Sequence, residues 1–493
     1  MDINKVVNKI TLKIKKNPLF YLLLFSLIIR LIYLLLNKSL WWDAHVYVGV
    51  GKYLYSGGKL GLWESFRPLI HSFIIGFFWK LGLNPLIIGK VLDIVFSLSA
   101  IWLTYLVGKK IFNKNVALVG ALLLSLSPEF LMYSGMILTE PLGITLGMLG
   151  IYLYLLSKDI TIKFSNTTLF FSGLFLALSF LTKFTLGIFF GMIIIIALFD
   201  KNKVTVKLKN LFILLFSFLL TITPYLYYNH ILYSNAFTPF IEGSLIVATA
   251  TWLYGQGVTY YFTQFFLMNP IYLFFFGYVY YFFKEKHWKQ LKLVLSFLIP
   301  IIIIIYFMFH VPRKETRYLA IALPFLSLLV AYTIIKIYHK LKETSSPIIR
   351  AKSFLVSCSI LVIITVLPFF LFVENVPPFE MEVVNIVNEK GLFGTIITTE
   401  PSLVSYLDNK LIILSGMDYA EEIYQKQKDY KLIYINDCEL SCAPKDLSCS
   451  KNKEELFSEI VKDNDLVYQG EHRDQERICV YTIYLPKSEL LKK

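Results

Sequence analysis

Long apolar runs separated by short polar segments fill the chain as far as Val373. Runs such as Pro18 to Leu36 and Ser353 to Val373 are long enough to cross about 30 Å of hydrocarbon as helices. The first run contains Arg30 and lacks a clear small-residue cleavage site, so we interpret it as a permanent anchor rather than a signal peptide. The pattern predicts a polytopic α-helical membrane protein with about eleven transmembrane helices.

Between these two runs, the apolar segments and the lysine clusters between them predict nine further spans. They are Pro85 to Val107, Val116 to Leu131, Pro141 to Leu156, Leu169 to Leu181, Thr185 to Phe199, Leu211 to Tyr228, Asn269 to Phe283, Leu291 to Phe309 and Tyr318 to Ile337. Residues 37–84 form a long first outer loop that is rich in aromatic residues and glycine. Within it, the apolar segment Leu69 to Leu81 has only about 13 residues, short for a span, and predicts an interfacial or re-entrant helix.

Composition and charge agree with this class. Of the 493 residues, 56% are hydrophobic and only 17% are charged, which excludes an ordinary soluble domain. The net charge of +14 comes largely from lysine clusters in alternate polar segments, as expected for loops held in the cytoplasm. These clusters are Lys5 to Lys16, Lys109 to Lys114, Lys201 to Lys209, Lys284 to Lys292 and Lys336 to Lys352. We therefore expect a cytoplasmic amino terminus in a multi-pass cell-membrane protein and no nucleic-acid partner.

The character of the chain changes after Val373. Glu374 to Pro378 reads as a linker, and residues 374–493 are polar enough for a separate soluble domain. Short β-branched runs alternate with helical stretches, which predicts a small α/β domain on the extracytoplasmic side. The predicted strands are Thr395 to Thr398, Leu411 to Leu414, Leu432 to Ile435 and Ile478 to Tyr484; the predicted helices are Ser402 to Asp408, Tyr419 to Lys426 and Lys453 to Asp463. Residues 1–373 form the transmembrane domain.

Four of the five cysteines lie in the soluble domain: Cys438, Cys442, Cys449 and Cys479. An even number of cysteines in an extracytoplasmic domain favours two disulfides, with three possible pairings. Zinc binding is the competing interpretation, and no histidine has finger-like spacing to support it. Cys358 lies within a predicted span and is interpreted as an ordinary core thiol.

Polar groups that do not belong in lipid gather on the outer side of this topology. They are Asp43, His45, Glu64, Arg67, Glu140, Lys183 and the turn Arg313-Lys314-Glu315-Thr316-Arg317-Tyr318. A basic run outside departs from the positive-inside tendency, and guanidinium and ammonium groups bind phosphate. Each residue also has a simpler explanation. Asp43 could be a solvated loop residue, and Glu140 could stabilise the start of a helix. Lys183 could extend its ammonium to the membrane interface, and the basic turn could bind lipid headgroups. Their conjunction on one side favours a site for a lipid-linked phosphate.

The order of these residues resembles a known family. Asp43 and Tyr47 follow the first helix, Tyr55-Ser56-Gly57-Gly58 comes next, and Arg67-Pro68-Leu69 precedes an apolar helix. The similarity continues through Ser127-Pro128, Thr139-Glu140-Pro141, Leu181-Thr182-Lys183, the Arg313 to Tyr318 turn and Pro324. Over about residues 20 to 335 the chain resembles the lipid-phosphate-dependent glycosyltransferases of GT-C fold, in the branch of protein O-mannosyltransferases and the aminoarabinose transferase of lipid A.

This resemblance implies an inverting, hexosyl- or mannosyltransferase-like enzyme. It would take a polyprenyl-phosphate sugar of the dolichyl-phosphate type as donor and a glycan, lipid or protein on the outer side as acceptor. Asp43 matches the family's proposed base and Glu140 its second-loop acid. The remaining matched positions imply contacts to substrate or phosphate: Tyr47, Glu64, Arg67, Lys183, Arg313, Lys314, Arg317 and Tyr318. Protein O-mannosyltransferases typically have Asp-Glu where this chain has Asp43-Ala44.

Two questions stay open from the residues alone. Asp43, Glu64, Glu140 and His45 could ligate a divalent metal, but no fixed-spacing metal motif occurs and the cofactor is undetermined. A transporter or lipid flippase would place charges near the bilayer midplane in two repeated halves, a pattern that we do not find. A third alternative is a non-catalytic glycan-assembly subunit that presents the disulfide-bonded domain.

Overall fold

The computed structural model describes residues 15–37, 39–159, 165–200, 203–248, 251–343, 347–371, 380–414, 417–427, 429–440, 442–443, 446–474 and 477–487. The chain divides into two compact units. Unit 1 comprises residues 1–38, 66–70 and 90–374, and unit 2 comprises residues 39–65, 71–89 and 375–493. The predicted linker Glu374 to Pro378 and the lysines Lys5, Lys9 and Lys13 lie outside the described residues.

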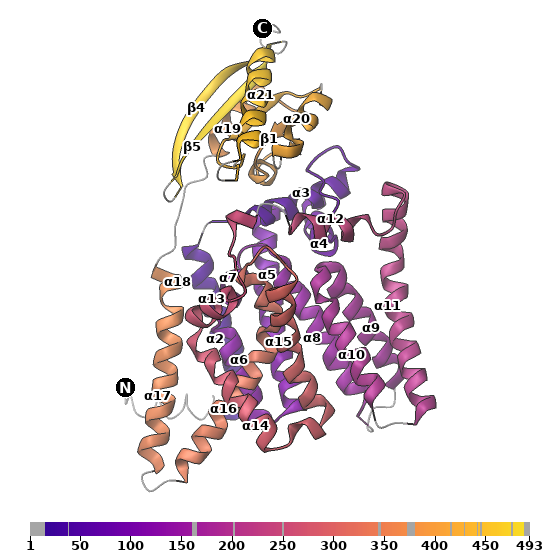
Figure 1. The fold of residues 1–493 in the computed structure, drawn as a ribbon, viewed down its shortest axis with the longest axis vertical. Coiled ribbons are helices and arrows are strands. Elements are labelled where there is room, and N and C mark those ends of the chain that lie inside the picture. The colour runs from indigo at the N-terminus through magenta and orange to yellow at the C-terminus, as the bar shows by residue number, and fades with distance from the viewer. Residues whose placement is uncertain are drawn as a thin grey trace. The chain divides into compact units, whose positions relative to one another are not determined.

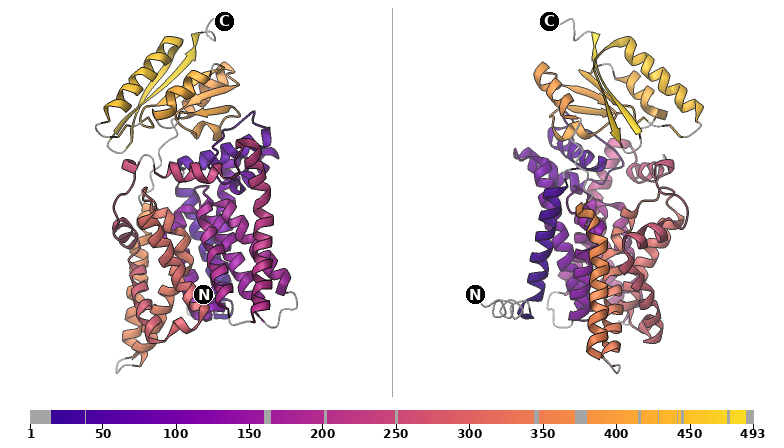
Figure 2. Two further views of the ribbon diagram at one scale, coloured as in Figure 1. Left: turned by 45° about the vertical axis from the view of Figure 1, so that its right-hand side comes forward. Right: turned by 90° about the vertical axis from the view of Figure 1, so that its left-hand side faces the viewer.

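Unit 1 is a bundle whose long apolar helices run in a similar direction (Figures 1 and 2). Its helices are α2 (Pro18–Leu36), α5 (Pro85–Ile111, from Lys90), α6 (Lys114–Ser125), α7 (Pro128–Tyr133), α8 (Thr139–Ser157), α9 (Ser165–Thr182), α10 (Gly187–Phe199), α11 (Val204–Tyr233), α12 (Thr238–Ile246), α13 (Tyr260–Met268), α14 (Phe274–Lys284), α15 (Leu291–Phe309), α16 (Leu323–Lys342), α17 (Pro347–Val366) and α18 (Pro368–Leu371).

Within the described ranges, eight helices are long and apolar enough to cross a membrane. The segment from α13 through Pro270–Lys284 also qualifies, but it bends by 116° and counts as a broken span or a re-entrant loop. Lys114–Ser125 and Phe184–Phe199 are apolar but shorter. These helices confirm the predicted polytopic class, while the count of about eleven spans stays a prediction.

The segment Thr316–Lys342 forms the centre of the bundle. In its apolar window 94% of the residues are buried, against 11% for the peripheral segment Ile349–Leu371. It contains α16, which packs against α6 and α14, and the 3₁₀ helix η5 (Thr316–Ala322) that precedes it. Charged residues at the start of this segment therefore lie among other helices rather than in lipid.

A buried polar network joins α2, α5 and α6. Arg30 Nε donates to Ser97 Oγ at 2.8 Å and Nη1 to the Ser125 carbonyl at 3.4 Å, while the Ser26 and Ser125 hydroxyls lie 2.6 Å apart. Hydrogen bonds of this kind hold helices together where lipid supplies no hydrophobic drive for their association. The arginine inside the first apolar run thus has a packing role.

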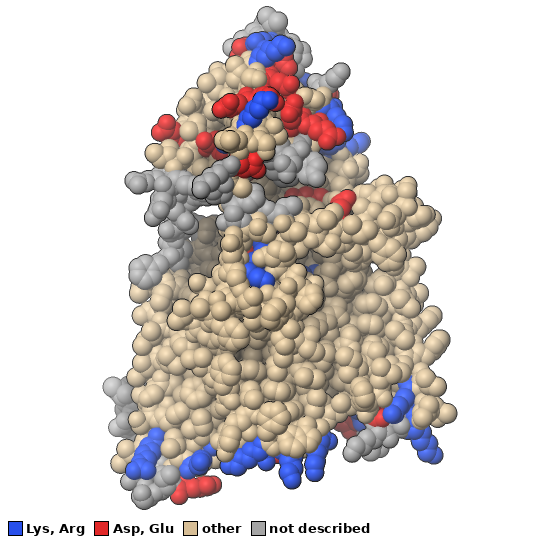
Figure 3. Space-filling model, viewed as in Figure 1, with Lys and Arg blue, Asp and Glu red and all other residues tan. Residues whose placement is uncertain are grey.

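Basic residues mark one end of the bundle. Lys292 at the start of α15 donates to the carbonyl of Lys110 on α5, and Lys158, just after α8, pairs with Asp200. Lys336 late in α16 pairs with Glu285. Figure 3 shows lysine and arginine along the lower rim of the helical body, below a broad uncharged band. This distribution is the one that the lysine clusters in the sequence predict.

Unit 2 contains a five-stranded sheet in the order β2-β1-β3-β5-β4. The strands are β1 (Thr395–Thr398), β2 (Lys410–Ile413), β3 (Leu432–Asn436), β4 (Asn464–Asp474) and β5 (Arg477–Pro486). β1 pairs in parallel with β2 and β3, whereas β5 pairs antiparallel with β3 and β4. Four of the five strands and the small α/β class are as predicted; β4 is an addition, because its polar sequence lacks a β-branched run.

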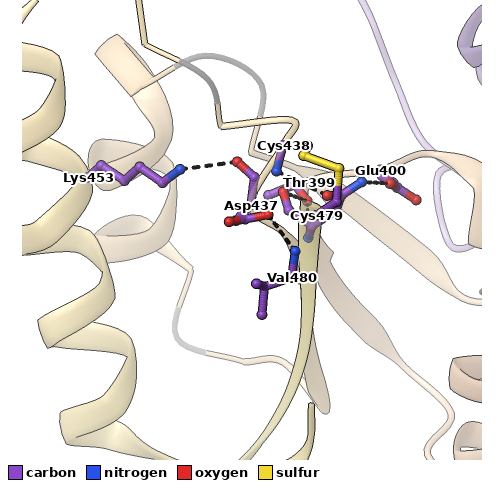
Figure 4. The surroundings of a disulfide bond; sticks show 8 residues. Thr399, Glu400, Asp437, Cys438, Lys453, Cys479 and Val480 are labelled. Carbon is purple, nitrogen blue, oxygen red and sulfur yellow. Dashed lines mark hydrogen bonds between the residues drawn. A yellow bond between two sulfur atoms is a disulfide. The ribbon is translucent and has the colours of Figure 1, made fainter. Parts of the chain in front are cut away.

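Helices α20 (Met417–Lys426) and α21 (Leu447–Asp463) cover one face of this sheet through a core that includes Tyr424, Ile433 and Leu456. A further helix, α19 (Glu380–Lys390), precedes β1. Two disulfides join Cys438 to Cys479 and Cys442 to Cys449, as predicted, and so select one of the three pairings. Figure 4 shows the first of them beside Asp437, whose carboxylate accepts from the Val480 N–H.

Most of the first loop, residues 39–65 and 71–84, belongs to the same compact unit as this domain. It forms α3 (Trp42–Ser56) and α4 (Ile70–Lys80), and α3 packs against the 3₁₀ helix η6 (Ser402–Ser405). A helix therefore forms where Leu69 to Leu81 predicts one, whereas α3 was expected only as loop. The division of the chain at residues 373 and 374 stays a prediction.

Candidate active site

Glu140 lies in the first turn of α8. A negative charge there interacts favourably with the helix dipole, and Pro141 is tolerated because N–H groups in the first turn have no partner within the helix. The side chain of Glu140 is 2% exposed, and Lys183 Nζ lies 2.5 Å from its carboxylate. Lys183 sits at the break between α9 and the 3₁₀ helix η1 (Phe184–Leu186), where the backbone is extended. The charge of Arg317 also acts on Glu140. Three segments far apart in sequence thus converge at one end of the bundle.

The turn before α16 is organised by Glu315. Its carboxylate lies 2.8 Å from Arg313 Nε and 2.5 Å from Arg317 Nε, and it accepts a hydrogen bond from the Tyr318 hydroxyl at 3.1 Å. All four side chains are partly or fully buried. Because η5 leads directly into the central helix, the turn is held at the middle of the bundle.

Arg313 is held by a second loop. Gly255 and Lys314 exchange two backbone hydrogen bonds of 3.2 Å, which places Tyr254 beside Arg313. The guanidinium carbon lies 3.5 Å above the centre of the Tyr254 ring, and Nη2 donates to the Tyr254 hydroxyl. A planar guanidinium stacked on an aromatic ring is well suited to recognise an anion.

The ring of Tyr318 lies between the ion pair of Glu140 with Lys183 and the turn around Glu315. Lys183 Nζ and the guanidinium of Arg317 each lie 5.8 Å from the centre of its ring. We call Glu140, Lys183, Arg313, Glu315, Arg317 and Tyr318 the charge cluster. It contains three cations and two carboxylates, so these groups carry a net positive charge.

Lys314 takes a different direction from its neighbours. Its ammonium donates to the carbonyls of Phe307 and Met308 at 2.8 and 2.7 Å and to that of Val311 at 2.5 Å, at the carboxyl end of α15. Burial lowers the pKa of this ammonium. A lysine here satisfies helix carbonyls that would otherwise lack partners.

Two buried carboxylates outside the set of predicted site residues lie close to the site. The first is Asp93 of α5, which accepts from the backbone N–H groups of Ile137 at 2.6 Å and Leu138 at 3.3 Å. Ile137 has a φ of 56°, a left-handed conformation that a β-branched residue rarely adopts. Asp93 thus holds a strained turn directly before Glu140. No spacing rule connects residue 93 with residue 137.

The second is Glu129 of α7, which is 1% exposed. It accepts from the Ser127 hydroxyl at 3.0 Å and from the side-chain amide of Asn269. The charges of Glu129, Glu140 and Arg317 all act on the hydroxyl of Tyr133, so Glu129 lies near the charge cluster. The signal available in the sequence was its position directly after Ser127-Pro128.

The first-loop residues fall on other elements. Asp43 lies in the first turn of α3, and His45 and Tyr47 lie on the same helix; all three are buried. The ring of Tyr47 meets that of His71 edge-on at 5.2 Å. Glu64 belongs to unit 2 as well, whereas Arg67, in unit 1, has its guanidinium 5.0 Å from the ring of Phe66.

The metal candidates find no support in this geometry. Within the ranges that the structure describes, no three His, Cys, Asp or Glu side chains gather in a way that could hold a metal ion. Metal binding by Asp43, His45, Glu64 or Glu140 rests on the sequence alone.

Solved structures with a similar fold cover nearly the whole chain. ArnT from Cupriavidus metallidurans, bound to undecaprenyl phosphate, aligns over 94% of this chain and 97% of its own, with a TM-score of 0.59 and 11% identity. The chain has the fold of the GT-C glycosyltransferases. The oligosaccharyltransferase AglB from Archaeoglobus fulgidus, in complex with an inhibitory peptide and a dolichol-phosphate, aligns over 86% of this chain and 70% of its own, with a TM-score of 0.59 and 11% identity.

A solved structure of a larger protein is also similar. The mycobacterial arabinofuranosyltransferase AftD aligns over 95% of this chain but 41% of its own, with a TM-score of 0.55 and 11% identity. Residues 66–228 match the sequence model of the dolichyl-phosphate-mannose-protein mannosyltransferase family. No curated protein matches the sequence. Together with its apolar helices, the GT-C fold makes this chain an integral membrane protein.

Proposed function

We propose that this chain transfers a sugar from a polyprenyl-phosphate donor to an acceptor on the outer side of the membrane, with inversion at the anomeric carbon. The observation that carries the proposal is the charge cluster: three cations and two carboxylates held at one end of a GT-C helical bundle, opposite the lysine-rich end. A positive surplus in a site of low dielectric stabilises a phosphate strongly.

In this proposal Lys183, Arg313 and Arg317 neutralise the leaving phosphate. Glu140 and Glu315 hold these cations in place and Tyr318 orders them around its ring. The ammonium of Lys314 contacts three carbonyls, so we assign it to holding the turn. Tyr47, Glu64 and Arg67 keep their proposed contacts to substrate.

Asp43 on α3 acts as the base. A carboxylate removes the proton of the acceptor nucleophile as the nucleophile attacks the anomeric carbon, the bond from that carbon to the phosphate oxygen breaks, and the phosphate leaves with the electron pair. General-base catalysis of this kind contributes about 10²- to 10⁴-fold to a rate. The similar structures of ArnT and AglB contain undecaprenyl phosphate and a dolichol-phosphate, which supports a donor of this chemical class.

The test is equilibrium binding of polyprenyl phosphate to the purified protein. Arg317→Ala should weaken binding at least tenfold, since a buried guanidinium–phosphate contact is worth more than about 1.5 kcal/mol. Lys336→Ala is the matched control, because Lys336 lies at the other end of the same central segment and pairs with Glu285. Equal binding by Arg317→Ala and the wild type would contradict the assignment of the phosphate site.

A further inference from the structure

The helix that carries Asp43 is enclosed on more than one side. Every residue of α3 from Asp43 to Lys52 is buried, which a helix lying on a surface does not show. A Cβ on Gly49 would lie 2.6 Å from Leu62 and 3.1 Å from Val404, and a Cβ on Gly51 would lie 2.7 Å from the Ser72 carbonyl. At Gly51, α3 therefore packs tightly against α4, and at Gly49 it packs against Leu62 and against Val404 of η6 in the C-terminal domain.

A hydrogen bond between buried side chains fixes the start of α3. His45, two residues after Asp43, shares a hydrogen bond of 2.6 Å between its Nδ1 and the hydroxyl of Ser405 at the end of η6. Both residues are buried. A bond of this kind is costly to break, because each polar group would remain without water.

A buried lysine fixes the other end of α3. Lys52 Nζ lies 3.0 Å from the Leu407 carbonyl and 2.8 Å from the Asp408 carboxylate, and it faces the ring of Trp79 at 5.8 Å. Burial lowers the pKa of Lys52, and Asp408 partly opposes this shift. Lys52 is 3% exposed, so its charge depends on these two partners.

The first loop also extends the sheet of the C-terminal domain. The N–H of Gly61 donates to the Asn409 carbonyl at 2.9 Å, and the Gly61 carbonyl accepts from the Leu411 N–H at 2.7 Å, beside the edge strand β2. Gly61 has a φ of 82°, and a Cβ there would lie 2.2 Å from the Gly49 carbonyl. Only glycine fits this close approach. We call the three attachments, through His45, Lys52 and Gly61, the α3 joint.

We infer that the C-terminal domain positions the proposed base: Ser405, Leu407 and Asp408 hold α3 through His45 and Lys52 and so fix the carboxylate of Asp43. This inference rests on the proposed function, in which Asp43 is the base. A general base works only within hydrogen-bond reach of the proton that it removes, and a small displacement of the base lowers the rate strongly. Turnover therefore depends on Ser405 and Lys52, whereas the residues that we assign to the leaving phosphate belong to unit 1.

A matched pair of variants in the full-length protein tests the joint. Ser405→Thr keeps the hydroxyl, and Ser405→Val has the same branched shape without it. Ser405→Val should lower kcat for sugar transfer about 10- to 100-fold with KM for the donor unchanged, the cost of a misplaced catalytic group. Ser405→Thr should stay near the wild-type rate. Lys52→Met, which removes the charge and keeps the length, should behave like Ser405→Val.

The rate of sugar transfer is divided by the number of molecules that bind polyprenyl phosphate, so a loss of folded protein does not lower the measured kcat. Asp43→Asn is measured in parallel. Wild-type kcat in both Ser405→Val and Lys52→Met, with transfer lost in Asp43→Asn, would overturn the positioning role and leave the proposed function intact. Wild-type transfer by Asp43→Asn would instead overturn the proposed function itself.

Discussion

The charge cluster of unit 1 and the α3 joint of unit 2 use buried charge in opposite ways. In the cluster, Lys183, Arg313 and Arg317 outnumber the carboxylates of Glu140 and Glu315. In the joint, each polar group meets a partner: His45 meets Ser405, and Lys52 meets a carbonyl and a carboxylate. A surplus of one sign marks a place that can receive an ion, whereas a matched set marks a place that fastens two segments.

Removing one member of the cluster should have the largest effect. Lys183→Met leaves Glu140 buried beside its lost partner, which should lower the free energy of unfolding by about 3–5 kcal/mol. The double variant Lys183→Met/Glu140→Gln should recover most of this stability but not the affinity for polyprenyl phosphate. Thermal unfolding and phosphate binding measured on both variants separate the two effects. Full affinity in the double variant would show that the surplus does not serve the donor.

Glu400 of unit 2, which follows β1, is another buried polar group whose side chain has hydrogen-bond partners. Its carboxyl accepts from the Ser402 hydroxyl at 3.3 Å and from the Asn436 amide, and burial raises its pKa to about 8, with Glu380 and Glu439 adding to the shift. The unfolded chain releases this proton near the ordinary value of 4.5 while the folded chain retains it. Stability should therefore fall as the pH rises from about 4.5 to about 8 and then level off.

Glu400→Gln imitates the neutral carboxyl and should flatten this fall, which for the wild type is on the order of a few kcal/mol. Denaturant unfolding, followed by a probe placed in the C-terminal domain, at several pH values from 4 to 9 measures it. An identical pH profile in the wild type and Glu400→Gln would show that Glu400 titrates normally in the folded domain.

Variants of Asp93 test whether the position of Glu140 in the charge cluster depends on the hydrogen bonds that Asp93 accepts. Asp93→Ala removes the acceptor for two buried N–H groups, which should cost about 1–3 kcal/mol. It should also lower kcat, because the strained turn before Glu140 loses its support. Asp93→Asn retains an acceptor oxygen and should recover part of kcat. Thr104→Ala is the control: Thr104 is buried on the same helix, and its hydroxyl donates to the Ala100 carbonyl. Equal kcat in Asp93→Ala and Thr104→Ala would exclude a positioning role.

Replacing Lys314 should give the smallest change in stability, and it should differ from replacing Arg317 in its effect on the affinity for polyprenyl phosphate. Lys314→Met removes the donor to two carbonyls in the last turn of α15 and to that of Val311 after it, which should lower stability by about 1 kcal/mol. The affinity for polyprenyl phosphate should be unchanged, unlike that of Arg317→Ala. A loss of affinity as large as that of Arg317→Ala would place Lys314 in the phosphate site.

The sequence predicts many elements of both units, and in each case for a physical reason. Apolar runs, and the lysines between alternate runs, report directly on helices and their ends, so the sequence alone assigns Glu140, Lys183 and Arg317 to one end of the bundle. In the soluble domain, β-branched runs identified four strands and the cysteines identified two disulfides.

The contacts that hold these residues in place could not be predicted. The bonds from Asp93 to Ile137 and from His45 to Ser405 join positions far apart in the chain, and no periodicity encodes them. Helix α3 was missed because its glycines, which favour a loop in a sequence, here permit close packing. Asp43 was recognisable as a candidate, whereas the partners of its helix were not.

The central claim is that Asp43 is the base for transfer from a polyprenyl-phosphate sugar. Membranes that contain the wild type or Asp43→Asn are given labelled polyprenyl-phosphate hexose, and both donor binding and sugar transfer are measured. The account predicts unchanged binding and a loss of transfer of about 10²- to 10⁴-fold in Asp43→Asn. Undiminished transfer by Asp43→Asn would contradict it.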